Sequence, residues 1–564
     1  MTTVRDAFFD VLRQHGMTTI FSNPGSTEVP LLAGFPADIE FVLCLHEASA
    51  VGAATGWSLG KQRPALALLH TTAGLGNAVG AIATARVNRA PVVIVVGQQD
   101  RRHLAYEPFL TGELEGLAGR YPVWTATPAR AADVPALVSR ARHQAVAARG
   151  PAVVIVPMDD WGEPYETSTR PPAPLALEIG AGVDRRLCSE VARRLLAARA
   201  PAIVAGAGAD HPRTWAALAE LAELLRCPVW QEPFGARAGF PQDSRRFAGH
   251  LPAGRAALRD ALAPHDVILV AGAAALRQYG YEPGPLFPTA TEVVVVTDDL
   301  AEASRSVADV AVLTPLPGFC ELLTRLVARR VGVRPDQPPA VRPSADGHRG
   351  NGSLPGGPGG AGRGLRAEDV FAALSARLPA DAVLVEETPS SRPQLQDMVP
   401  ARTPLGFLSA AMGGLGFAMP AAMGLKLACP ERPVVAVIGD GSSLYSCQSL
   451  WSAQRYRAGV LYVVLSNGGY AIMDALAAEA GGQPPWPSFS DVDIGLLARS
   501  FGCPSVRVKT PDELARVLDD AIPTLASRSE PLLVDVTVQP VSAPYRRAAL
   551  AASTSAIHPD RRSA

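Results

Sequence analysis

Residues 434–470 read VVAVIGDGSSLYSCQSLWSAQRYRAGVLYVVLSNGGY, and this stretch decides the fold class. An apolar run of strand length, residues 434–438, breaks into Gly-Asp-Gly-Ser. A helix-like segment follows, and a second buried run, residues 460–465, ends in Ser-Asn-Gly-Gly-Tyr. Two parallel strands joined by a helix would place Asp440 and Asn467 side by side at the carboxyl edge of a sheet, where open α/β sheets bind ligands.

The residue types at this edge suit a diphosphate and a hard metal ion. Glycines let the backbone approach a diphosphate, and the start of the following helix offers free N–H groups. The Asp440 carboxylate and the Asn467 amide oxygen could hold Mg²⁺, with diphosphate oxygens and water completing the shell. A plain βαβ unit is the alternative. The whole pattern resembles the thiamine diphosphate signature of the 2-oxo acid decarboxylase and acetolactate synthase superfamily.

Length and composition limit the class of protein. At 564 residues the chain is too long for one core and suggests about three domains. With 48% hydrophobic residues and a formal net charge of -1, it has no basic excess for nucleic acid or a membrane surface. Its seven cysteines form no CxxC pair, which favours reduced thiols and the cytoplasm. No signal peptide and no bilayer-spanning apolar run are expected.

Alternating strand and helix signals predict three doubly wound, parallel-sheet α/β domains. In the first domain, polar residues such as Glu47 and His70 collect where apolar strands end, as at a ligand-binding edge. We expect a pyrimidine-binding domain over residues 1–180, a middle domain over 181–333, a Gly- and Pro-rich linker over 334–364, a diphosphate- and Mg-binding domain over 365–541, and a mobile tail over 542–564.

The middle domain contains Gly206, Ala207 and Gly208, which resemble part of a dinucleotide loop. The full spacing is absent, and tight turns often give such triplets. Related enzymes have a middle domain that binds FAD in some members and nothing in others. We therefore do not expect FAD here.

Glu47 is the candidate catalytic carboxylate. Thiamine diphosphate supplies the hard chemistry, and the protein must place a carboxylate against its pyrimidine ring. Glu47 follows a buried strand and precedes an Ala- and Gly-rich helix, where a carboxylate is partly desolvated. A simple interaction with the helix dipole is its alternative role.

Further motifs resemble the benzoylformate decarboxylase family over nearly the whole chain, apart from the linker and the tail. The matching segments are NPGSTE at 23–28, Glu47, LHTTAGLGNA at 69–78, GQQ at 97–99, MDDW at 158–161, GGLGF at 413–417 and the final signature. The resemblance implies that Ser26 holds the substrate carboxylate and that His70 takes part in proton transfer. A capping or packing histidine is the alternative for His70.

The resemblance also implies a cofactor site shared between subunits. Gly413 would offer its carbonyl to the pyrimidine amine, and Leu415 would support the bent cofactor unless it is simply core. The remaining implied cofactor contacts are Asn77, Thr388, Ser390, Gly441, Ser442 and Tyr470. Mg²⁺, or Ca²⁺ in its place, would be held by Asp440, Asn467 and the carbonyl of Gly469. A homodimer would be the minimum assembly, and a tetramer is usual.

Two departures from the family bear on activity. Tyr279 stands where the family carries a second active-site histidine, and a phenol is a poorer proton shuttle at neutral pH than an imidazole. Slow protonation after CO₂ loss would let a second carbonyl compound react instead, giving carboligation. Residues 471–476 also lack the bulky aromatics that the family places after Tyr470, so the substrate pocket is expected to be reshaped.

The expected function is thiamine diphosphate- and Mg²⁺-dependent decarboxylation of a 2-oxo acid with an aromatic or bulky side chain, to an aldehyde and CO₂. The first alternative is a carboligase of the acyloin or acetolactate synthase type, acting in a biosynthetic pathway on an aldehyde or keto acceptor. The second is a catalytically silent paralogue, against which the joint presence of Glu47, Asp440 and Asn467 argues.

Overall fold

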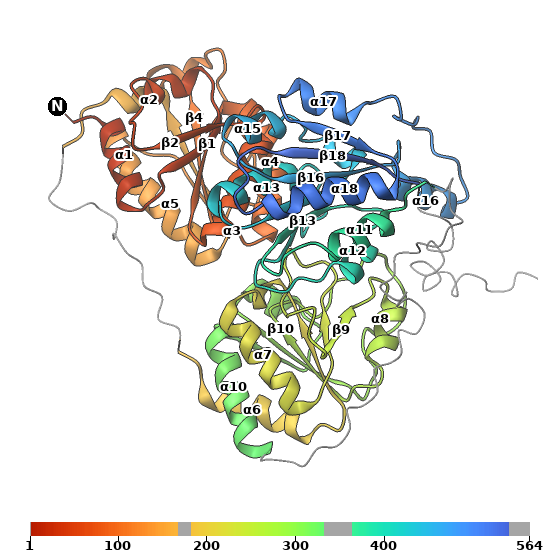
Figure 1. The fold of residues 1–564 in the computed structure, drawn as a ribbon. Coiled ribbons are helices and arrows are strands. Elements are labelled where there is room, and N and C mark those ends of the chain that lie inside the picture. Colours follow the sequence, from red (N-terminus) through yellow and green to blue (C-terminus); the bar gives the residue numbers. More distant parts are fainter. Residues whose placement is uncertain (1, 167–181, 332–363, 541–564) are drawn as a thin grey trace, which may run out of the picture.

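The computed structural model describes residues 2–166, 182–331 and 364–540. They form three units in chain order, each built on a six-stranded sheet whose paired strands are all parallel. In Figure 1 the N-terminal unit (red to orange) and the C-terminal unit (teal to blue) lie next to each other, with the middle unit (yellow to green) below them. The prediction of three doubly wound, parallel-sheet units is confirmed.

The N-terminal unit has the strand order β2-β1-β3-β4-β6-β5. Its central strands β4 and β6 are apolar runs buried along their whole length, as expected of a parallel sheet covered by helices on both faces. Its elements are α1 (Val4–Gln14), β1 (Thr19–Asn23), η1 (Ser26–Glu28), α2 (Val29–Leu32), β2 (Glu40–Leu43), α3 (Glu47–Lys61), β3 (Ala65–His70), α4 (Thr71–Val87), β4 (Val92–Gln98), η2 (Arg101–Tyr106), β5 (Trp124–Ala126), η3 (Ala131–Asp133), α5 (Val134–Ala148), β6 (Pro151–Pro157) and η4 (Met158–Gly162).

The middle unit has the strand order β12-β11-β10-β7-β8-β9. Its elements are α6 (Arg185–Ala197), β7 (Pro201–Ala205), η5 (Ala207–Ala209), α7 (Pro212–Leu225), β8 (Val229–Gln231), β9 (Phe247–His250), α8 (Arg255–Leu262), β10 (Val267–Ala271), β11 (Glu292–Thr297), α9 (Leu300–Arg305), β12 (Val310–Leu313) and α10 (Leu316–Val331). Helices α6, α7 and α10 share one apolar core with the strands and cover one face of the sheet (Figure 1).

The C-terminal unit has the strand order β14-β13-β15-β16-β18-β17. Its elements are α11 (Ala367–Ser375), β13 (Val383–Glu387), α12 (Arg392–Met398), β14 (Phe407–Ser409), α13 (Ala418–Ala428), β15 (Val434–Gly439), α14 (Asp440–Ser443), α15 (Ser449–Arg455), β16 (Leu461–Ser466), α16 (Ala471–Glu479), α17 (Ile494–Ser500), β17 (Ser505–Val508), α18 (Pro511–Ala521), η6 (Ile522–Thr524) and β18 (Leu532–Thr537). Strands β15 and β16 pair in parallel with Gly439 opposite Leu465, and two short helices, α14 and α15, connect them.

The N-terminal and C-terminal units share one continuous apolar core. Helices α3 and α13 lie side by side in it (Figure 1). A Cβ on Gly56 would overlap the carbonyl of Ala421, and a Cβ on Gly424 would overlap the carbonyl of Ala53. Because only glycine allows this approach, the two units of one chain pack backbone against backbone.

Other residues of the chain occupy the space next to the glycine triplet of the middle unit. A Cβ on Gly206 would overlap Gly272, and one on Gly208 would lie 3.0 Å from the guanidinium of Arg89, which comes from the N-terminal unit. That guanidinium pairs with three carboxylates of the middle unit, those of Asp298, Asp299 and Glu302. The glycines therefore serve close packing in this chain, and the absence of FAD stays a prediction.

Most of the predicted linker and the whole predicted tail lie outside the described residues. Among the described helices none combines the length and apolar character that crossing a membrane requires. All seven cysteines are free thiols, and five of them are buried.

Candidate active site

Asp440 follows β15 and faces the loop after β16. Its Oδ2 accepts the N–H groups of Asn467 at 2.9 Å and Gly468 at 2.7 Å, and its Oδ1 accepts that of Gly441 at 2.8 Å. Burial raises the pKa of the Asp440 carboxyl above its ordinary value, and these three N–H groups act in the opposite direction. The structure thus brings Asp440 and Asn467 together at the sheet edge.

The oxygen atoms at this edge fit a magnesium-type ion. Asn467 presents its amide oxygen beside Asp440 and uses it to accept the N–H of Gly469 at 3.1 Å. Carboxylate, amide and main-chain oxygens are the hard ligands such an ion prefers. Across the three described ranges, no group of three or more His, Cys, Asp and Glu side chains could hold a metal. An ion at Asp440 would therefore need amide, main-chain and diphosphate oxygens.

Tyr470 forms a wall beside this edge. A Cβ on Gly441 would come 2.7 Å from the Tyr470 ring, so a larger residue than glycine would not fit there. The Tyr470 ring packs edge-on against Phe489, with ring centroids 5.0 Å apart. Ser442, next to Gly441, is 5% exposed. The predicted residues Gly441, Ser442 and Tyr470 therefore lie together around the Asp440 backbone.

Glu47 is the first residue of α3 and is 7% exposed. Asn23, at the end of β1, donates from Nδ2 to Oε1 of Glu47 at 2.9 Å. Asn77, on α4, donates from Nδ2 to Oε2 at 3.0 Å. Each carboxylate oxygen is thus held by one amide, which fixes the plane of the carboxylate while leaving further lone pairs free.

His70 ends β3 and has a partner that the sequence analysis missed. Its Nδ1 lies 3.0 Å from Oε2 of Glu28 and 2.9 Å from the hydroxyl of Thr27. Glu28 is 1% exposed and also accepts the N–H of Gly25 at 2.7 Å. An ionised carboxylate only accepts, so Nδ1 is the donor and Nε2 remains available on the other side of the ring. The local signal was the glutamate that closes the Asn-Pro-Gly-Ser-Thr-Glu turn.

A second missed residue, Glu387, holds the end of the loop that carries Gly413 and Leu415. Its carboxylate accepts the N–H groups of Gly416 at 2.6 Å, Phe417 at 2.9 Å and Ala418 at 2.6 Å, at the start of α13. Burial raises the pKa of Glu387 to about 7. Gly413 has φ +74°, so this loop needs glycine at that position.

The other predicted residues differ in how they are placed. The Thr388 hydroxyl is buried and donates to Oε1 of Glu386 at 3.0 Å, while Ser390 is half-buried after β13. Ser26 is exposed in η1, at the same strand edge as Glu47. The Tyr279 side chain is 75% exposed on the middle unit.

Among the described residues, no hydrogen bond or ion pair joins the Glu47 and His70 groups to the Asp440 group. The N-terminal unit therefore carries one set of predicted residues and the C-terminal unit another. That the two units bind different halves of the cofactor stays a prediction.

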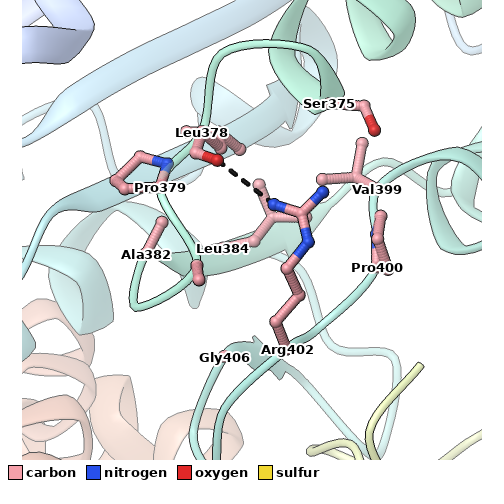
Figure 2. Close-up of a pocket in the computed structure, with 10 residues that line it drawn as sticks. Ser375, Leu378, Pro379, Ala382, Leu384, Val399, Pro400, Arg402 and Gly406 are labelled. Atoms are coloured by element: carbon pink, nitrogen blue, oxygen red, sulfur yellow. Dashed lines mark hydrogen bonds between the residues drawn. The ribbon is translucent and has the colours of Figure 1, made fainter. Parts of the chain in front are cut away.

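Two cavities differ in what they can hold. One of about 490 Å³ adjoins the loop after β16 and is lined in part by Asn467, Tyr470, Asp474 and Trp486. The other, of about 10 Å³, is crossed by the Arg402 guanidinium, which donates to the Leu378 carbonyl at 3.2 Å (Figure 2). The second has room for at most one water, so only the first adjoins the site as a usable space.

Comparison with protein-family models finds three consecutive matches. They are the N-terminal TPP binding domain of thiamine pyrophosphate enzymes over residues 2–118, the central domain over 188–323 and the C-terminal TPP binding domain over 391–536. Each match falls within a different one of the three sheet units.

Individual relatives agree with this assignment. The chain is 36% identical over 544 residues to benzoylformate decarboxylase of Pseudomonas aeruginosa, covering 96% of this chain and 100% of the relative. It is 26% identical over 571 residues to an acetolactate synthase large subunit of Parasynechococcus marenigrum, covering 94% of this chain and 87% of the relative. A solved structure of a thiamine diphosphate-dependent 4-hydroxybenzoylformate decarboxylase of Rhodococcus jostii superimposes with a TM-score of 0.87 at 32% identity, covering 96% of this chain and all of that one. The chain belongs to the thiamine pyrophosphate enzyme family, as a benzoylformate decarboxylase-like enzyme that depends on thiamine diphosphate.

Proposed function

We propose that this enzyme catalyses the non-oxidative decarboxylation of a 2-oxo acid of the benzoylformate type, with an aromatic or otherwise bulky side chain. The observation that carries the proposal is the His70 ring, held at a strand end by the buried Glu28 carboxylate. A histidine fixed in this way can exchange a proton from Nε2 with a group bound in front of the strand edge. The 36% identity to a benzoylformate decarboxylase over nearly the full chain supports the substrate class.

The N-terminal unit would hold the pyrimidine ring and the substrate carboxylate. Glu47, oriented by Asn23 and Asn77, would contact the pyrimidine ring. Ser26, exposed at the same edge, would donate to the substrate carboxylate. His70 would move the proton that the substrate oxygen gains or loses.

The C-terminal unit would hold the diphosphate and Mg²⁺. When bound, thiamine diphosphate supplies the electron sink that CO₂ loss requires. Asp440, Asn467 and the Gly469 carbonyl would ligate the metal, and Gly441 and Ser442 would contact the diphosphate. Gly413 and Leu415 would position the rest of the cofactor.

Carboligation is the second candidate, and Tyr279 favours it. A phenol in place of the family's imidazole would slow the final protonation, which leaves time for an aldehyde or keto acceptor to react. The high exposure of Tyr279 leaves room for a second substrate beside it. The acetolactate synthases among the relatives belong to this reaction class by name.

We also propose that the enzyme works as a homodimer or a larger homo-oligomer in the cytoplasm. The lack of any hydrogen bond or ion pair between the two described groups is compatible with a site completed by a second subunit. Tyr106 and Phe109 are 84% and 88% exposed, which supports an apolar surface covered in an assembly. Seven free thiols support a reducing compartment.

Product analysis tests the reaction. The protein is supplied with thiamine diphosphate and Mg²⁺, and benzoylformate, phenylpyruvate and pyruvate are each offered with and without benzaldehyde. Free benzaldehyde and CO₂ from benzoylformate would support decarboxylation, whereas an acyloin without free aldehyde would support carboligation. No CO₂ from any of the three would refute both proposals for these substrates.

Glu47→Gln separates an enzyme from a silent binding subunit. The amide keeps the size of the side chain and removes the carboxylate, so turnover should fall by at least about 100-fold. Cofactor binding and thermal stability that change little would locate the loss in catalysis. Equal turnover in the variant would refute the role of Glu47.

A further inference from the structure

The loop from Ala410 to Leu415 lies where all three units meet. Glu387 binds the residues that follow its C-terminal end, so the N-terminal end must be held by other residues. Strand β14 leads into this loop, and Ala411 is its second residue. Met412 is 44% exposed, whereas Ala411 is buried. The contacts at Ala411 therefore decide where the exposed part, including Gly413, is placed.

Asn88 holds this end of the loop from the N-terminal unit. It lies at the end of α4 and is 1% exposed. Its Nδ2 donates to the carbonyl of Ser409 at 2.9 Å, and its Oδ1 accepts the N–H of Ala411 at 2.9 Å. The buried side chain satisfies two main-chain groups of another unit, as a strand partner would.

Arg277 holds the same residue from the middle unit. It donates from Nη1 to the carbonyl of Ala411 at 3.1 Å and from Nη2 to the carbonyl of Phe234 at 2.7 Å. Its Nε lies 3.5 Å from the carboxylate of Glu232, which is 3% exposed. The buried carboxylate thus lies beside the guanidinium that donates to the loop, without accepting a hydrogen bond on Oε1 from any described residue.

We propose that Asn88 and Arg277 are positioning residues for the cofactor loop: together they fix both main-chain polar groups of Ala411 and so set the place of the Gly413 carbonyl. The inference rests on the proposed function, in which that carbonyl accepts from the pyrimidine amine. It gives the middle unit a part in cofactor binding, although that unit contributes no diphosphate ligand.

The test compares two ligands that share the diphosphate but not the pyrimidine. Affinities for thiamine diphosphate and for inorganic diphosphate, both with Mg²⁺, are measured on the cofactor-free protein by calorimetry or fluorescence quenching. The variants are Asn88→Leu and the double variant Glu232→Gln/Arg277→Met, which removes both partners so that no unpaired buried charge remains. A misplaced loop should weaken thiamine diphosphate by about tenfold and leave inorganic diphosphate within about twofold.

The control is Arg149→Met. Arg149 also links the N-terminal and middle units, through Asp298 at 2.6 Å, but does not touch the loop. It should leave the ratio of the two affinities unchanged.

Each outcome bears on the inference. An unchanged ratio in both loop variants would overturn it, and so would equal weakening of both ligands, which indicates a general structural effect. If either variant fails to fold, Arg277→Lys decides by the same ratio, since lysine keeps the charge beside Glu232 but lacks the fork that reaches both carbonyls. Failure of the unaltered protein to bind thiamine diphosphate would instead refute the proposed function.

Discussion

Glu387 offers the sharpest test of how burial and main-chain donors compete in this enzyme. Burial raises the pKa of its carboxyl from an ordinary value of 4.5 to about 7. The pKa difference of about 2.5, at about 1.36 kcal/mol for each pKa unit, corresponds to about 3 kcal/mol. Because the folded form binds the proton more tightly, this stability is present below about pH 4.5 and is lost as pH rises through about 7.

Glu387→Gln removes the titration. Thermal or urea unfolding of both proteins is followed between about pH 5 and about pH 7.5, and the difference in stability is plotted against pH. The unaltered protein should lose about 2 kcal/mol relative to the variant over this range, because part of the change lies below about pH 5. The variant should also lose stability by an amount that is the same at every pH. In the variant a single amide oxygen replaces the two carboxylate oxygens that accept three N–H groups.

Glu513 is a matched control for Glu387. It also accepts main-chain N–H groups before a helix, from Lys509 at 2.8 Å and Thr510 at 3.2 Å, but at the surface. These hydrogen bonds lower the pKa of Glu513, so the stability difference between the unaltered protein and Glu513→Gln should stay nearly constant between about pH 5 and about pH 7.5 and should fall only below about pH 4.5. If the unaltered protein instead gained stability relative to Glu387→Gln as pH rose, the main-chain donors would outweigh burial and the reasoning would be refuted.

Three further perturbations follow from the site and the surface. Glu28→Gln should lower kcat/KM by about 10- to 100-fold and also lower thermal stability, since one amide oxygen replaces the carboxylate pair that serves His70, Gly25 and Thr27; steady-state rates equal to those of the unaltered enzyme would contradict this. Asp440→Ala, or removal of divalent metal by a chelator, should weaken thiamine diphosphate binding by at least about tenfold in calorimetry, and added Mg²⁺ should restore only the chelated protein. Gly76→Leu tests whether α4 lies at a subunit contact: it should lower the assembly state in light scattering without unfolding the chain, because among the described residues nothing lies within 4 Å of a Cβ there. Gly162→Leu, at an equally open glycine, should leave the assembly intact, and the same assembly in both variants would show that α4 is not at a subunit contact.

The sequence could predict what local chain geometry decides. Asp440 and Asn467 end adjacent parallel strands, so their proximity follows from the βαβ pattern alone. Glu47 was identifiable for a similar reason, as the first residue of the helix that follows strand β2. In each case a short segment of sequence determines both the strand or helix and the position of the polar residue at its end.

Contacts between distant segments could not be predicted in this way. Asn88 and Ala411 are 323 residues apart, and nothing near either residue marks the pair. Glu387 looked like a neighbour of the diphosphate contacts Thr388 and Ser390, but its carboxylate turns to main-chain groups about 30 positions later. The α3–α13 contact likewise depends on Gly56 and Gly424. Neither helix contains a local signal that its glycine faces another helix.

Arg89 of the N-terminal unit lies between Gly208 and three carboxylates of the middle unit, and this contact would hinder nucleotide binding there. A dinucleotide diphosphate at Gly208 would have to displace the guanidinium and then face Asp298, Asp299 and Glu302, whose charges would repel it. No single substitution removes both the guanidinium and the negative charge, since replacing Arg89 alone leaves three carboxylates unpaired. Substituting Arg89 or one of its three carboxylate partners would therefore leave unpaired charge at the contact between the N-terminal and middle units.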